Sequence, residues 1–481
     1  MNVTLEAQIQ RAAALRQSER WAEAVAAYKA ILSARQDLPN SWYNLGYCLR
    51  RAGDPVGALD AYQQALNFGA PAPEEARLNR AVILLDDLNR EEEGAAELQR
   101  ALALNPNYAP ALMNLANLAE DRGRRADALS AYERVLALSD PPLEALARYL
   151  SLKGATGSDD PLLQRAARAI NAVSVSPEDK ASLAFAMGKA LDAVGAYDEA
   201  FAAYALANRI ARALTPKSQL FDRKAHAALI DAIIAAHPVG DGLEAPAADD
   251  PNLVFICGLF RSGSTLCEQV LSGHSRVTPG GELPWIPALA RELGYPSAIP
   301  KARAVQARAL YCAGLFRQLP AFDILTDKRP DNFLYIGLIK RLFPAAKIIH
   351  TVRNPKDNAL SLYFLHLDPS MSYAQDLSDI AFYIAQYRKL MAHWKACFGA
   401  DILDFAYDDF VHAPRQAMEP VLRGLGLTWD DHFLSFHERS SRVRTASVWQ
   451  VREPLYAHAS GRWRRYESRL KALVGLEGAG F

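Results

Sequence analysis

The chain contains 481 residues, a length that predicts two or three domains. Its 54 Lys and Arg residues balance its 54 Asp and Glu residues, and a net charge of zero excludes a general attraction to nucleic acid or to anionic membranes. No segment approaches the roughly 20 apolar residues of a membrane span, and the N-terminal stretch lacks an apolar run of signal-peptide length. The cysteines are scattered without CxxC spacing, which argues against a disulfide framework or a zinc site. We therefore expect a soluble, cytoplasmic protein with no membrane span and no nucleic-acid partner.

The first half of the chain repeats a small residue followed, four positions later, by an aromatic residue. The pairs are Ala24 and Tyr28, Ala58 and Tyr62, Ala128 and Tyr132, and Ala200 and Tyr204, with Gly94 and Leu98 in the same slots. Two residues four apart lie on one face of a helix, so the small one allows close helix packing and the aromatic one fills the next turn. Three glycines, Gly53, Gly123 and Gly195, each lie five residues before a small residue and permit a left-handed turn.

This pattern resembles the tetratricopeptide repeat, a helix-turn-helix unit of about 34 residues. The resemblance covers roughly residues 5–215 and implies an all-α solenoid, with about four clear units and a degenerate stretch at 140–180. Such solenoids bind peptides or other proteins in a concave groove. A generic Ala-rich helical bundle is the alternative.

The segment "AAHPVGDGLEAPAADDPN" is rich in Pro, Gly and Asp and reads as a linker. We predict a solenoid at 1–235, a linker at 236–251 and a second domain at 252–481. That domain places buried strands at "NLVFICG", "AKIIHTVRN" and "DILDFAYDDF" between helices expected at 302–318, 333–343, 356–366 and 377–398. This alternation predicts an α/β domain with a central parallel sheet, whose ligands sit at the carboxyl ends of the strands.

The stretch "GLFRSGST", residues 258–265, has the glycine spacing of a phosphate-binding loop between a strand and a helix. Ser264 stands where such a loop carries lysine, which argues against nucleotide hydrolysis. Arg261 instead offers a planar fork suited to an oxyanion, and backbone N–H groups at the helix start favour the same ligand. Further donors are the hydroxyls of Ser262, Ser264 and Thr265. An ordinary strand-to-helix turn is the alternative.

A second anion site is predicted from "IIHTVRNPKDNALSLYF". Arg353 ends a strand, and Ser361 lies about two turns into the following helix, so both side chains can face one crevice. A solvated arginine beside a helix start is the alternative. Two anion sites on one sheet indicate a ligand with two separated anionic groups.

Together, "FRSGSTL" and "HTVRNPKDNALSLY" resemble the paired signatures of sulfotransferases that use 3′-phosphoadenosine 5′-phosphosulfate. The resemblance covers roughly 252–470 and is greatest to the tyrosylprotein sulfotransferase branch and its bacterial relatives fused to tetratricopeptide repeats. It implies a P-loop-like α/β sulfotransferase domain in which Arg261, Gly263 and their hydroxyl neighbours hold the 5′-phosphosulfate. Arg353 and Ser361 would take the 3′-phosphate, and no metal is needed.

The same resemblance assigns the chemistry. Glu282 in "TPGGELPWIP" is the expected base, and Lys328 in "LTDKRPDNF" is expected to steady the leaving group together with Arg261. An exposed loop carboxylate and a surface lysine are the alternatives. Cytosolic sulfotransferases use a histidine base; His274 and His350 lie outside that branch's motif, His350 reads as structural, and His366 is a weaker rival.

Further donor contacts are expected nearer the C-terminus. Tyr407 in "DFAYDDF" would lie near the adenosine, and Ser447 and Arg452 in "RTASVWQVREPLY" would belong to a cofactor segment, although the family often has lysine where Arg452 falls. The stretch "SGRWRRYESRL" either packs over the nucleotide or forms an amphipathic terminal helix.

We therefore predict transfer of sulfonate to an acceptor hydroxyl on a peptide, a protein or a hydroxyl compound, with protein tyrosine among the candidates. The repeats would recruit the acceptor or a protein partner, and a homodimer stays open. One alternative is a tetratricopeptide scaffold with an inactive nucleotide-binding domain. The other is a P-loop kinase that acts on a small molecule.

Overall fold

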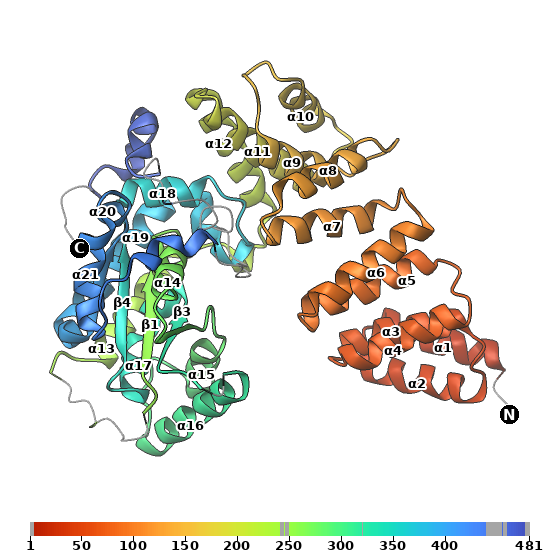
Figure 1. Ribbon diagram of the computed structural model, residues 1–481, viewed down its shortest axis with the longest axis horizontal. Helices are drawn as coiled ribbons and strands as arrows, with labels where there is room; N and C mark the ends of the chain where they lie inside the picture. The colour runs from red at the N-terminus through yellow and green to blue at the C-terminus, as the bar shows by residue number, and fades with distance from the viewer. Residues whose placement is uncertain are drawn as a thin grey trace. The chain divides into compact units, whose positions relative to one another are not determined.

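The computed structural model describes residues 4–240, 245, 250–319, 321–438, 455 and 459–476. The chain forms two compact units, residues 1–153 and 154–481 (Figure 1). Both predicted C-terminal donor contacts, Ser447 and Arg452, lie outside the described residues.

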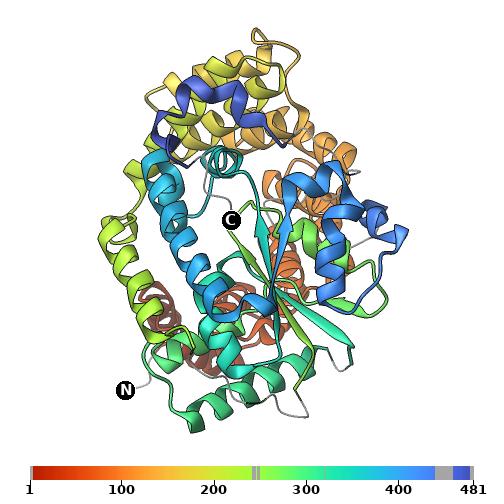
Figure 2. The ribbon, with the colours of Figure 1, turned by 90° about the vertical axis from the view of Figure 1, so that its left-hand side faces the viewer.

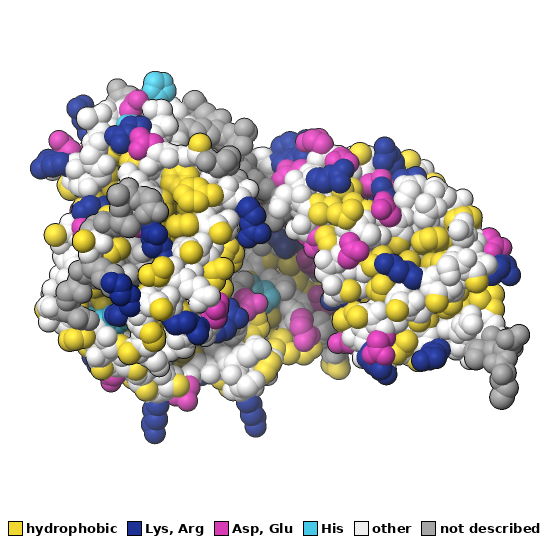
Figure 3. Space-filling model, turned by 90° about the horizontal axis from the view of Figure 1, so that it is seen from below, with side chains coloured by type: hydrophobic (Ala, Val, Ile, Leu, Met, Phe, Trp, Pro, Cys, Tyr) yellow, Lys and Arg dark blue, Asp and Glu magenta, His cyan; other side chains and the backbone are white. Residues whose placement is uncertain are grey.

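Unit 1 is a succession of helical hairpins. Its elements are α1 (Leu5–Gln17), α2 (Trp21–Ala34), α3 (Pro39–Arg51), α4 (Pro55–Asn67), α5 (Pro73–Val82) continued by a π-helical turn at Ile83–Asp87, α6 (Glu91–Leu104), α7 (Ala109–Asp121), α8 (Arg125–Leu136) and α9 (Leu143–Lys153). On the face drawn in Figure 3, basic and acidic side chains of this unit are interspersed, as expected from the balanced composition.

The repeat residues pack as the sequence predicts. Tyr62 is buried in α4, and a Cβ at Gly46 of α3 would lie 2.9 Å from its ring, so the glycine allows the ring to fill the gap between the two helices. Gly53 and Gly123 end their helices in the left-handed region, at φ of 86° and 71°. The predicted tetratricopeptide architecture is confirmed.

Unit 2 begins with more helices and continues into a sheet. The helices are α10 (Pro161–Asn171), α11 (Pro177–Ala193), α12 (Tyr197–Leu214) and α13 (Arg223–Ala236). The strands are β1 (Leu253–Gly258), β2 (Val277–Pro279), β3 (Ile324–Lys328), β4 (Lys347–Val352) and β5 (Ile402–Ala406). They lie in the order β2-β3-β1-β4-β5 with every pairing parallel, which confirms the predicted central sheet. Strands β2 and β3 were not predicted from the sequence.

Helices cover both faces of the sheet (Figure 2). They are α14 (Ser264–Leu271), α15 (Trp285–Leu293), α16 (Lys301–Gln318), α17 (Ile336–Leu342), α18 (Pro355–Tyr363), α19 (Leu377–Phe398), α20 (Tyr407–His412) and α21 (Pro414–Gly424), with 3₁₀ turns at 217–219, 330–335, 369–375, 399–401, 431–438, 462–469 and 471–473. Residues of β1 alternate between the faces. Ile256 joins a core with α14, α20 and α21, whereas Phe255 packs against Tyr311 of α16 and Phe343 after α17.

The hairpin of α11 and α12 packs directly against the sheet's helices. The Tyr204 ring of α12 stacks on Phe364 at 3.9 Å, and the Asn208 side chain donates to the Tyr363 carbonyl at 2.7 Å. Asp379 of α19 accepts hydrogen bonds from Arg212 and Arg223 at 2.9 and 2.6 Å. Although this hairpin has the sequence of a repeat, it is built into the same compact unit as the sheet.

Candidate active site

The Gly-rich loop, residues 259–263, connects β1 to α14. Gly263, at φ 102°, precedes α14, and a Cβ there would lie 2.7 Å from the Tyr407 ring. The Ser262 backbone N–H and hydroxyl both donate to the Leu259 carbonyl, at 3.0 and 2.6 Å, so this serine closes the loop on itself. The first N–H groups of α14 have no partner inside the helix, and the helix dipole makes this end attractive to an anion.

The second predicted motif meets this loop. Arg353 directly follows β4, and its Nη1 donates to the Arg261 carbonyl at 3.1 Å. The Arg261 Nε in turn donates to the Ser361 hydroxyl of α18 at 3.0 Å. Tyr407 lies beneath, with its ring centroid 4.8 Å from the Arg353 guanidinium carbon. Arg261 lies about 100 residues before Arg353 and Ser361 in the sequence, yet the three residues form one cluster at the carboxyl ends of β1 and β4.

Lys328 and Glu282 form an ion pair at the end of β3. The Lys328 Nζ lies 2.5 Å from Glu282 Oε1; the lysine side chain is only 2% exposed, and that of the glutamate is 42% exposed. The backbone fixes this geometry, because Lys328 N donates to the Gly281 carbonyl at 2.8 Å and Gly280 N donates to the Thr326 carbonyl at 3.0 Å. One partly open carboxylate is thus held against one buried ammonium.

Residues 251–431, which contain the loop, the ion pair and the second motif, match the model of the sulfotransferase family. This part of the chain is a sulfotransferase-family domain. Residues 39–68 and 111–146 match models of the tetratricopeptide repeat, so unit 1 consists of such repeats.

Relatives of the chain include an uncharacterized protein of Aquifex aeolicus, 28% identical over 418 residues, which cover 83% of this chain and 54% of the relative. The chain therefore spans about half the length of that protein. Protein-tyrosine sulfotransferase 1 of Danio rerio is 23% identical over 267 residues, or 49% of this chain and 72% of the relative. Among solved structures, the sulfotransferase domain of the Synechococcus PCC 7002 olefin synthase matches 47% of this chain and 91% of its own at 22% identity, with a TM-score of 0.35.

A buried carboxylate that the sequence analysis missed supports the ion pair of the sulfotransferase domain. Glu268 of α14 accepts hydrogen bonds at its Oε1 from the Thr326 hydroxyl, at 2.7 Å, and from Gly281 N, at 3.1 Å. Burial raises the pKa of the Glu268 carboxyl, and the nearby Lys328 ammonium opposes that rise. Glu268 therefore holds the turn that carries Glu282. A carboxylate within the apolar helical stretch "STLCEQVL" was the available signal.

The three histidines considered as rival bases lie elsewhere. His350 is buried within β4 and bonds through its two ring nitrogens to Asp404 and Tyr387. His366 lies beyond the end of α18, which stops at Tyr363, and stacks on the Phe185 ring at 4.9 Å. His274 follows α14, and its Nδ1 accepts from Arg276 N at 3.1 Å.

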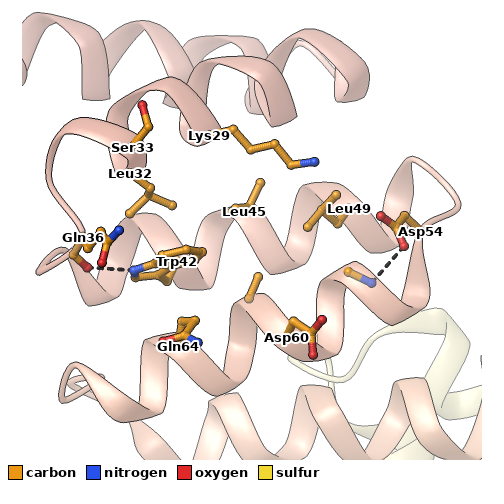
Figure 4. A pocket seen from close by; sticks show the side chains of 12 residues that line it. Lys29, Leu32, Ser33, Gln36, Trp42, Leu45, Leu49, Asp54, Asp60 and Gln64 are labelled. Atoms are coloured by element: carbon orange, nitrogen blue, oxygen red, sulfur yellow. Dashed lines mark hydrogen bonds between the residues drawn. The ribbon is translucent and has the colours of Figure 1, made fainter.

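Unit 1 contains a separate pocket of about 440 Å³ between α2, α3 and α4 (Figure 4). Trp42 lies in its wall and donates through Nε1 to the Gln36 carbonyl at 2.7 Å. Leu32, Leu45 and Leu49 give the pocket apolar surface, while Lys29 and Asp60 reach its rim. In the described parts of the chain, no cluster of three His, Cys, Asp or Glu side chains is arranged to hold a metal ion, and no helix has the length and apolar character of a bilayer crossing.

Proposed function

We propose that this protein transfers a sulfonate group from 3′-phosphoadenosine 5′-phosphosulfate to an acceptor hydroxyl. The observation that carries the proposal is the contact between Arg261 and Ser361, which joins the loop to the second motif. The ion pair of Glu282 and Lys328 lies at the end of β3, which pairs with β1, the strand that precedes the loop. The chemistry of the cluster fits a donor with two anionic ends. Within the described residues, the Nε of Arg353 is a buried donor without a hydrogen-bond partner, and a phosphate oxygen would satisfy it.

Each group in the ion pair and the loop then has a role. The Glu282 carboxylate takes the proton of the acceptor hydroxyl as the acceptor oxygen forms its bond to sulfur. The bond between sulfur and the 5′-phosphate oxygen breaks, and its electron pair leaves with adenosine 3′,5′-bisphosphate. An ammonium has three N–H donors, so Lys328 can contact both Glu282 and the departing oxygen. Arg261 and the α14 N–H groups stabilise the same developing charge, while Ser264 and Thr265 hold sulfonate oxygens.

Glu282→Gln tests the assigned base. This change preserves size and removes the proton acceptor, so kcat is expected to fall by about 10²–10⁴-fold while the Kd for the bisphosphate changes little. Glu292→Gln on α15 is the matched control, because this exposed glutamate lies 3.9 Å from Arg303 and outside the cluster. Wild-type turnover in Glu282→Gln would remove the assignment.

Titration with the bisphosphate decides between the enzyme and its alternatives. Saturable binding is expected; its absence would favour a scaffold with an inactive domain, and Mg²⁺-dependent ATP turnover would favour a kinase. Protein tyrosine is one candidate acceptor, and mass spectrometry of peptides and phenols after incubation with labelled donor identifies the class. A cytoplasmic location belongs to the same proposal and is supported by five cysteines that are scattered in the sequence without CxxC spacing.

The repeats are proposed to recruit the acceptor or a protein partner through the pocket of unit 1. Trp42→Ala removes the largest side chain of its wall. We expect the KM for a protein acceptor to rise while the KM for a small phenol is unchanged. Equal effects on both acceptors would contradict a recruiting role.

A further inference from the structure

A C-terminal segment, residues 459–469, lies directly on the second motif. The Asp357 carboxylate of α18 accepts from Gly461 N at 2.6 Å and from Trp463 N at 2.8 Å. The Arg353 Nη2 donates to the Ala459 carbonyl at 2.8 Å. Gly461, at φ 75°, makes the left-handed turn that brings both N–H groups onto one carboxylate. The segment therefore contacts the arginine and the helix start to which we assign the 3′-phosphate.

The opposite side of the segment is anchored to the last helical hairpin. Asp192 of α11 accepts from Arg462 Nη2 at 2.6 Å through one oxygen and from the Tyr466 hydroxyl through the other. The Arg462 guanidinium carbon lies 5.1 Å from the Phe364 ring centroid, and Tyr466 meets the same ring edge-on at 5.0 Å. Because the Tyr466 side chain is buried, these contacts are part of the packed interior and hold the segment in place.

We infer that Asp192 is a positioning residue through which the last helical hairpin holds the C-terminal segment against Arg353 and Asp357, and so increases affinity for the 3′-phosphate of the donor. This inference rests on the proposed function. The physical reason is conformational entropy. The segment consists of 3₁₀ turns and must be ordered before it can make its contacts, and the anchor on the hairpin orders it before the donor binds. Donor binding then does not include the entropic cost of ordering the segment. A hairpin with a repeat sequence thereby becomes part of the donor site.

Asp192→Asn tests this with two nucleotides, adenosine 3′,5′-bisphosphate and AMP, which lacks the 3′-phosphate. An amide keeps one acceptor but loses the charge-assisted bonds, so we expect the Kd for the bisphosphate to rise about tenfold or more and the Kd for AMP to change less than about threefold. Asp379→Asn is the matched control, because Asp379 of α19 pairs with Arg212 of the same hairpin and with Arg223 of α13 without touching the segment. It should leave the ratio of the two Kd values unchanged. A general loss of stability would weaken the binding of both nucleotides equally.

Arg462→Gln repeats the test from the segment's side, which keeps it decisive if Asp192→Asn folds poorly. Hydrogen exchange of the Gly461 and Trp463 amides in the nucleotide-free protein should accelerate in both variants. This measurement separates the two proposals: wild-type protein without saturable bisphosphate binding would refute the proposed function, whereas unchanged exchange would refute the anchor. An unchanged ratio of Kd values in both variants, or tighter bisphosphate binding, would overturn the inference.

Discussion

Glu268 offers the sharpest test of how the fold places the reactive carboxylate. Its side chain, which belongs to α14, is buried, and the one oxygen Oε1 accepts hydrogen bonds from both the Thr326 hydroxyl and Gly281 N. Glu268→Leu removes that acceptor while roughly preserving volume, and Glu268→Gln keeps an oxygen in the same place without the charge. Comparing the two variants separates hydrogen-bond support of the turn from the electrostatic influence of a carboxylate near Lys328.

The magnitude follows from the two donors. Each buried donor left without a partner costs about 1–3 kcal/mol, so Glu268→Leu should lower the free energy of unfolding of unit 2 by roughly 2–6 kcal/mol. The turn would also lose its tie at Gly281, the residue before Glu282. A displacement of about 1 Å at a reacting group can reduce the rate by on the order of 10²-fold, and we expect a loss of kcat of that order.

Chemical unfolding and steady-state kinetics measure both effects. Glu268→Gln should stay within about tenfold of wild-type kcat and lose less stability, because the amide oxygen can accept both bonds. The Kd for adenosine 3′,5′-bisphosphate should change little in either variant, since the groups that donate to the Glu268 carboxylate, Thr326 and Gly281, are not assigned to the phosphates. A Glu268→Leu protein with wild-type kcat and stability would refute the reasoning, and a Gln variant as damaged as the Leu variant would show that charge, not support of the turn, is what matters.

Two further predictions concern stability. Burial raises the pKa of Asp327 from its ordinary value to about 7. The contribution of this carboxyl to the free energy of unfolding is therefore complete below about pH 4 and is lost as pH rises through 7. The contribution is at most roughly 4 kcal/mol, and the unfolding free energy measured at pH 5 and pH 8 should change less in Asp327→Asn than in wild type. Gly188→Ala would place a Cβ 2.8 Å from the Tyr204 ring and should lower the thermal midpoint of unit 2, at a cost of about 1–3 kcal/mol. Gly399→Ala, with no atom within 4 Å of its Cβ, should not.

Much of the site could be predicted because its signals are local in sequence. The spacing of Gly258 and Gly263 predicts the loop, and Arg353 before a helix that contains Ser361 predicts the second motif. These patterns indicate local structure directly, because glycine permits the conformation of the loop and an arginine at the end of a strand faces the crevice where ligands bind. What spacing could not predict is that Arg261 and Ser361 touch, because their contact depends on the pairing of β1 with β4.

The missed features depend on packing between distant segments. The sequence of β3 is "ILTDK", and its polar residues do not indicate a buried strand. Asp327 is paired with Tyr311 and Lys328 with Glu282, and these partners come together only in the folded protein. Asp357 and Asp192 look like ordinary helix-surface carboxylates in the sequence. Their partners lie more than 100 residues away in the C-terminal segment, so no local pattern could assign them.

The last hairpin also resolves a general difficulty of repeat proteins. A repeat cannot bury both of its faces alone, and the final one in a series needs a cap. In α12 the tyrosine of the repeat pattern, Tyr204, stacks on Phe364, the residue that directly follows α18, and Tyr466 meets the same ring edge-on. The sulfotransferase-family domain is thus the cap. Because the capping ring follows Ser361 by three residues, a change that unseats the hairpin must also disturb α18, and the hairpin and the second motif are expected to lose their order together.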